Sequence, residues 1–79
     1  MDKGEELAGL YHRTREAADA LHARASEIVA LTERLEELTE GNDDAWYAGA
    51  RARVEAKAAM GQSEELRRAL DELRERMGR

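Results

Sequence analysis

Two stripes of residues, one in each half of the 79-residue chain, restrict its fold more than any other feature of the sequence. Within each stripe the residues recur three and four positions apart, so they share one face of an α-helix and turn it toward a partner. The two halves meet at Gly41 and Asn42, which mark a reversal of the chain. The first stripe consists of Leu7, Leu10, Thr14, Ala17, Leu21, Arg24, Ile28, Leu31, Leu35 and Leu38. The second consists of Ala45, Gly49, Ala52, Ala56, Ala59, Ser63, Leu66, Leu70, Leu73 and Met77.

The two stripes are complementary in side-chain size. Near the turn the first stripe carries large residues and the second carries small ones, and further from the turn the sizes are exchanged. Because a protein core is filled at uniform density, this pattern favours one register. We therefore predict an all-α fold, an antiparallel two-helix hairpin of the coiled-coil type. The predicted contacts are Leu38 with Ala45, Leu35 with Gly49, Leu31 with Ala52, Ile28 with Ala56, Ala17 with Leu66 and Thr14 with Leu70.

The hairpin is expected to form a single domain over residues 5–79. Gly41 suits the left-handed residue that follows a helix, and Asn42 or Asp43 can cap the next helix with a side-chain oxygen. Gly61 could interrupt the second helix, but the stripe keeps its phase through this glycine, so we predict one continuous helix. The expected segments are a flexible tail at 1–4, a first helix at about 5–40, a turn at 41–42 and a second helix at about 43–77.

Composition narrows the classes of function. The chain has no cysteine and no proline, and 39% of its residues are charged, which is typical of long helices. Its net charge of −5 argues against nonspecific nucleic-acid binding, which depends on neutralising phosphates. No apolar stretch approaches the roughly 18 residues of a membrane span, and the acidic start is unlike a signal peptide. We expect no membrane insertion and a cytoplasmic location, with secretion as the alternative.

One flank of the predicted hairpin is less polar than the other. Because two helices cannot enclose their own core, a third apolar column normally packs on another pair of helices. We therefore expect a four-helix bundle, formed as a homodimer or a heterodimer with another helical hairpin. The alternative is a monomeric hairpin whose arginine stems cover the aromatic rings. The residues expected at the partner interface are Tyr11, Ala18, Ala25, Trp46 and Met60.

The sequence contains no arrangement of residues that predicts catalysis. His12 and His22 are expected at outward-facing, solvent-exposed positions of the first helix, and Ser26 and Ser63 have no histidine placed to activate them. A ligand pair formed by His12 and Glu16 on an exposed helix face is weak evidence for a metal. We therefore predict a non-enzymatic protein without cofactor or metal.

Acidic residues gather at the predicted turn. Carboxylates at the end of the first helix are unfavourable by about 0.3–1 kcal/mol each, because they face the negative end of the helix dipole. Residues that break a local rule can mark function, but a solvated surface also accounts for them. The residues of this acidic tip are Glu36, Glu37, Glu40, Asp43 and Asp44.

A tryptophan just after the turn of an acidic helical hairpin resembles the WxG-type (early secreted antigen-like) proteins of type VII secretion systems. Trp46, Ala50 and Val54 match the pattern of that family, whereas Ala48 occupies the glycine position of the motif and Gly49 is displaced by one. The resemblance implies a dimer of hairpins that is exported by such a system or pairs with its cargo.

Two other classes remain open. Asp43, Asp44, Trp46, Tyr47 and Arg51 are similar in kind to the tip of the coiled-coil finger in Gre-type transcription factors. That resemblance implies an acidic-tipped regulator that binds RNA polymerase. A small phage-type adaptor or inhibitor is the third possibility.

Overall fold

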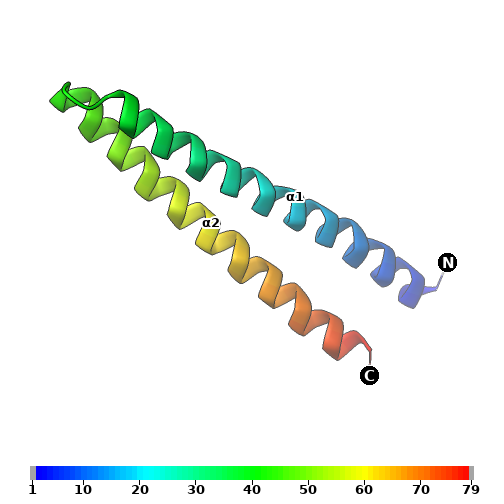
Figure 1. Ribbon diagram of the computed structural model, residues 1–79. Helices are drawn as coiled ribbons and strands as arrows, with labels where there is room; N and C mark the ends of the chain where they lie inside the picture. The colour runs from blue at the N-terminus through cyan, green and yellow to red at the C-terminus, as the bar shows by residue number, and fades with distance from the viewer. Residues whose placement is uncertain (1, 79) are drawn as a thin grey trace.

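The computed structural model describes residues 2–78 and consists of two long helices joined by a tight turn (Figure 1). Helix α1 spans Lys3–Leu38 and helix α2 spans Asp43–Met77. The helices run antiparallel beside each other, and both ends of the chain lie away from the turn (Figure 1). The Cα atoms extend over 60 × 18 × 13 Å. The predicted all-α helical hairpin is confirmed, and it has the shape of a rod two helices wide.

Helix α1 begins earlier than the sequence predicted. Asp2 adopts an extended backbone and its carboxylate accepts a hydrogen bond from the Gly4 amide at 2.9 Å, which satisfies one free N–H of the first turn. Lys3 and Gly4, which we expected in a tail, are therefore helical. Met1 lies outside the described residues.

Helix α1 also ends earlier than expected, at Leu38. The Thr39 hydroxyl donates to the carbonyl of Leu35 at 2.9 Å, at the point where the helical hydrogen bonds stop. Gly41 follows with a φ of +92°, the left-handed conformation predicted for it. Asn42 then caps α2, because its side chain accepts from the Ala45 amide at 3.2 Å. Helix α2 continues through Gly61 without a break, as predicted.

The contact between the helices is made by residues that are mostly small. In each helix the buried positions recur every seven residues, as in a coiled coil. The hydroxyls of Thr32 and Ser63 donate to the carbonyls of Val29 and Met60 at 2.8 and 2.7 Å, so both are buried without an unsatisfied proton. The buried residues are Ala18, Ala25 and Thr32 of α1, with Ala56, Ser63 and Leu70 of α2.

The predicted pairing of the stripes is wrong for all of the α1 stripe and for Ala52, Ala59, Leu66 and Leu73 of the α2 stripe, which are exposed. Leu31, Leu35 and Leu38 are 56%, 54% and 65% exposed, so they do not lie in the contact. Relative to the prediction, α1 is rotated about its own axis by the angle between two successive residues. The residues that directly follow the stripe positions therefore face α2. A Cβ added to Gly49 would lie 3.6 Å from Glu36 Cα, whereas the predicted neighbour of Gly49 was Leu35.

The physical reason is that α1 carries two usable faces and a single hairpin can cover only one of them. Residues such as Ala18 and Ala25 let the two backbones approach closely, which large leucines would prevent. Our prediction matched large residues with small ones between the two stripes and assigned Ala18 and Ala25 to an outer, partner-facing flank. The small-residue face packs on α2, and the leucines remain on the surface.

Candidate functional site

An exposed apolar surface, which we call the leucine face, runs along most of α1. Most of its residues directly precede a buried or half-buried residue of this helix, as Leu31 precedes Thr32 and Leu21 precedes His22, so they lie beside the interhelical contact. Each is between 47% and 65% exposed. Single exposed leucines are common on proteins, but six leucines and one isoleucine on one face of one helix form a row, which Thr14, Ala17 and Arg24 interrupt. On α1 the leucine face consists of Leu7, Leu10, Leu21, Ile28, Leu31, Leu35 and Leu38.

Helix α2 contributes to the same side of the hairpin. Two antiparallel helices that lie side by side are related by a twofold axis perpendicular to the plane that contains them. Residues that directly precede the contact residues therefore lie on the same side of this plane in both helices. On α2 these positions are Ala52, Glu55, Ala59, Gln62, Leu66 and Ala69, which precede the half-buried Arg53, Met60 and Arg67 and the buried Ala56, Ser63 and Leu70. Leu66 and Leu73 are 40% and 42% exposed. On α2 this side of the hairpin is therefore mixed, with Glu55 and Gln62 among small and apolar residues.

The partner interface expected from the sequence is in large part inside the hairpin. Ala18 and Ala25 are 2% and 6% exposed because they pack between α1 and α2, so in this conformation they are not available to another protein. Tyr11 and Met60 are half-buried at the same contact. Trp46 is 40% exposed near the turn. The predicted interface residues Ala18 and Ala25 are thus covered by α2, and the α1 residues predicted for the interhelical seam are exposed.

The other side of the hairpin is held by ion pairs between the helices. Arg15 hydrogen-bonds Asp71, and this bond is the largest effect that raises the pKa of the Arg15 guanidinium above its ordinary value. Arg67 Nε lies 3.1 Å from Asp19 Oδ1, close enough for an ion pair, although the two atoms are not aligned as a hydrogen bond. Arg15 also contacts Asp19 within its own helix, at 3.5 Å. These ion pairs, made by the half-buried Arg15 and Arg67, connect the two helices beside the contact.

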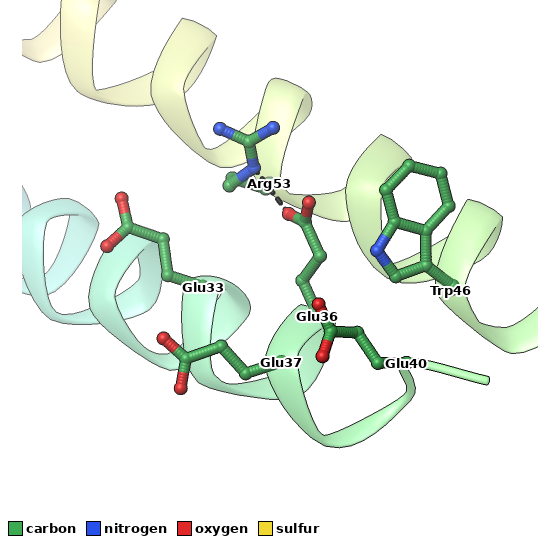
Figure 2. Close-up of a pocket in the computed structure, with 6 residues that line it drawn as sticks. All are labelled: Glu33, Glu36, Glu37, Glu40, Trp46 and Arg53. Atoms are coloured by element: carbon green, nitrogen blue, oxygen red, sulfur yellow. Dashed lines mark hydrogen bonds and ion pairs between the residues drawn. The ribbon is translucent and has the colours of Figure 1, made fainter. Parts of the chain in front are cut away.

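The acidic tip is partly neutralised across the hairpin. Glu36 reaches from α1 to Arg53 on α2, and Arg53 Nε donates to its carboxylate at 2.6 Å (Figure 2). Glu37 pairs with Arg34 at 2.9 Å on the surface of α1. Glu33, Glu36, Glu37, Glu40, Trp46 and Arg53 line a shallow depression here.

Two further carboxylates of the tip, Asp43 and Asp44, lie in the first turn of α2. That position is favourable for negative charge because it faces the positive end of the helix dipole. The tip is therefore a partly paired, charged surface.

His22 and Ser63 form a hydrogen bond that our sequence reasoning missed. His22 was expected on the outside of α1, but it is half-buried at the contact, and its Nδ1 lies 2.8 Å from Ser63 Oγ. The single hydroxyl proton of Ser63 goes to the carbonyl of Met60. The Nδ1–H of His22 is therefore the donor to Ser63.

That arrangement is the reverse of an activated nucleophile, in which the histidine accepts the proton of the hydroxyl. Ser63 is also 2% exposed, so a substrate could not reach it. The bond connects the two helices. The sequence feature that could have predicted this hydrogen bond is the position of His22 directly after Leu21 of the stripe. That position lies on the face of α1 that contacts α2.

Two other kinds of interaction, with a metal ion and with a bilayer, concern residues 2–78. His12 and Glu16 are 3.1 Å apart and largely exposed. Within this range no three His, Asp or Glu side chains gather as a group that could hold a metal ion. Neither described helix has a stretch long and apolar enough to span a bilayer.

Fold and surface together define a helical hairpin whose principal uncommitted surface is the leucine face. Compared with protein-family models, with curated protein sequences and with solved structures, the chain has no match. Its function is therefore argued from the hairpin itself.

Proposed function

We propose that this chain is a non-enzymatic protein–protein interaction module that pairs its leucine face with another helical hairpin. The observation that supports the proposal is the exposure of Leu31, Leu35 and Leu38, each more than half exposed on the outside of a formed hairpin. Covering such a residue contributes roughly 1 kcal/mol, about half of what full burial of a leucine gives. Several leucines in one row therefore favour a partner that covers all of them.

The partner that suits this surface is a second amphipathic hairpin. The leucine face is long, straight and flanked by charged positions, and a row with 3-4 spacing packs on another helix. The product is a four-helix bundle, as we expected from the sequence, but through a different face. This mode of pairing is compatible with a WxG-type secretion substrate or its pairing partner. The alternative of an RNA polymerase regulator has less support, because it uses residues at the turn and gives no role to the exposed leucine face.

The proposal is tested by photocrosslinking in the native host. A benzophenone amino acid replaces Leu31 in one variant and, as the matched control, Ser26 in another. Both positions are exposed on α1, but Ser26 lies on the side away from the leucine face. We expect strong crosslinks to a helical protein from position 31 and few from position 26. Equal crosslinking from both positions, or none from position 31, would contradict the proposal.

A further inference from the structure

We propose that the hairpin carries a second interaction surface near its turn, on the side away from the leucine face. We call this surface the aromatic groove, and its occupant is a short segment of a partner protein that has a lysine or arginine beside a large apolar residue. The inference goes beyond the proposed function and does not rest on it. The aromatic groove consists of Glu33 and Glu40 of α1, with Trp46, Ala50, Arg51 and Val54 of α2.

The aromatic groove lies opposite the leucine face because of its sequence positions. The leucines mostly precede residues of the interhelical contact, whereas the residues of the groove follow them. Glu33 follows the buried Thr32, and Val54 follows the half-buried Arg53. Residues that directly follow contact residues lie on one side of the hairpin plane in both helices, so α1 and α2 form the groove together.

Trp46 separates two depressions of different chemistry. On one side its indole shares a depression with carboxylates of α1 (Figure 2). On the other side it shares a more apolar depression with Ala50 and Val54. Trp46 is 40% exposed and Val54 is 59% exposed, so a partner can reach both. Binding sites combine an apolar lining with a few polar groups that orient the ligand, and both parts meet at this tryptophan.

The apolar part of the groove is short. Trp46, Ala50 and Val54 follow one another at helical spacing, and the next residue that directly follows a contact residue is Lys57. The apolar strip therefore ends after three turns of α2. Its length suits one or two apolar side chains, and a long partner helix would extend past it onto charged positions.

The charges at the two edges of the groove select the polar part of the partner. Within the described part of the chain neither Glu33 nor Glu40 forms an ion pair, whereas Glu36 is paired with Arg53. Arg51 lies on the outer edge of the groove. A basic residue of the partner meets two carboxylates and an aromatic face, which also attracts cations, whereas an acidic residue meets one guanidinium. The groove therefore favours a basic residue on the α1 side.

The two parts of the groove contribute differently to binding. Exposed ion pairs contribute little affinity, because water and salt screen them. Most of the affinity should come from the apolar contact with the indole and Val54, since buried tryptophans often dominate small interfaces. The carboxylates then set the orientation of the partner segment and exclude acidic segments.

The experiment selects peptides on the folded protein. A phage library of random peptides is first depleted on the Trp46→Ala variant and then bound to the immobilised parent protein. The depletion removes peptides that bind the leucine face. We expect the enriched peptides to carry a lysine or arginine next to a large apolar residue. Enrichment of acidic peptides, or no enrichment after depletion, would overturn the proposal.

The most enriched peptide is then synthesised, and its dissociation constant is measured by fluorescence anisotropy. Trp46→Ala should weaken binding about tenfold or more. Val54→Ser changes an exposed position and should also weaken binding while circular dichroism shows unchanged helicity. Leu31→Glu, on the leucine face, is the control and should bind as the parent does. Unchanged affinity in both groove variants, or a loss in Leu31→Glu, would overturn the aromatic groove as the binding surface.

A second pair of variants tests the charge of the partner. Glu33→Gln with Glu40→Gln should weaken the basic peptide about fivefold at low salt and make its affinity less dependent on salt. Glu5→Gln with Glu6→Gln makes the same change of net charge at the other end of the rod and should have little effect. Equal affinity in the two double variants would overturn a basic segment as the partner. None of these results bears on the crosslinks from position 31, which test the proposed function.

Discussion

Side-chain volume at single positions determines which face of α1 meets α2. Ala18 and Ala25 are almost fully covered, although they are far less hydrophobic than the leucines next to them. Thr32 and Ser63 are buried as well, because their hydroxyls are satisfied by carbonyls of their own helices. Small volume, and not apolar character alone, is thus what the interhelical contact selects.

Replacing a covered alanine by leucine tests this reading. Ala25→Leu adds three carbon atoms to a closed contact, and overpacking of this kind costs about 1–3 kcal/mol. Ala30→Leu makes the same change at an exposed position of α1 and should alter stability little. The free energy of unfolding is measured by urea denaturation followed by circular dichroism. If Ala25→Leu were as stable as Ala30→Leu, the contact would not be as close as described.

Each helix is continuous because local signals agree with its periodicity. Asp2 and Asn42 cap the N-termini, and Gly41 takes the left-handed conformation between the helices. Gly61 is the weak point of α2, since glycine in a helix costs about 1 kcal/mol relative to alanine. A Cβ added at Gly61 would meet no atom within 4 Å, so nothing in the hairpin requires a glycine there.

Gly61→Ala should therefore stabilise the hairpin by up to about 1 kcal/mol, because alanine restricts the unfolded chain and favours the helix. Gly41→Ala is the matched comparison and should be destabilising, since its φ of +92° strains any residue with a Cβ. Thermal unfolding of both variants beside the parent protein gives the result. A lower melting temperature for Gly61→Ala would argue that α2 bends or opens at this glycine.

The helices, their order, the turn and the cap at Asn42 could be predicted from sequence because they depend on spacing and on a few residues with special backbone preferences, whereas Asp2 was expected in a tail and caps α1. The face of α1 that contacts α2 could not be predicted in this way. Both the leucine row and the row that contains Ala18, Ala25 and Thr32 have the 3-4 spacing, and periodicity alone does not rank them. Leu35 and Gly49 are complementary in size, but complementarity does not tell whether two residues belong to one chain or to two. His22 was placed outside for the same reason, since its position follows from the choice of row.

The whole molecule is a thin rod that buries little of its own surface. Few side chains are fully covered, and the largest apolar residues lie outside the contact. A chain of this size is marginally stable even when compact, and an isolated pair of helices has less interior still. Pairing through the leucine face would supply the missing interior, so stability and association should be coupled.

That coupling predicts that unfolding depends on protein concentration. If two copies fold and associate together, a hundredfold rise in concentration adds about 2.7 kcal/mol per dimer and raises the melting temperature by several degrees. Leu31→Glu places a carboxylate in the middle of the leucine face and should abolish this dependence. Ser26→Glu adds the same charge on the other side of α1 and should retain it.

Circular dichroism over a hundredfold range of concentration measures the effect for the three proteins. A melting temperature of the parent protein that stays constant over this range would show that the hairpin reaches its stability alone. In that case the leucines would have to be covered by a different protein. Retention of the dependence in Leu31→Glu would instead place the association outside the leucine face, because a pair of buried carboxylates without partners is not tolerated in a closely packed interface.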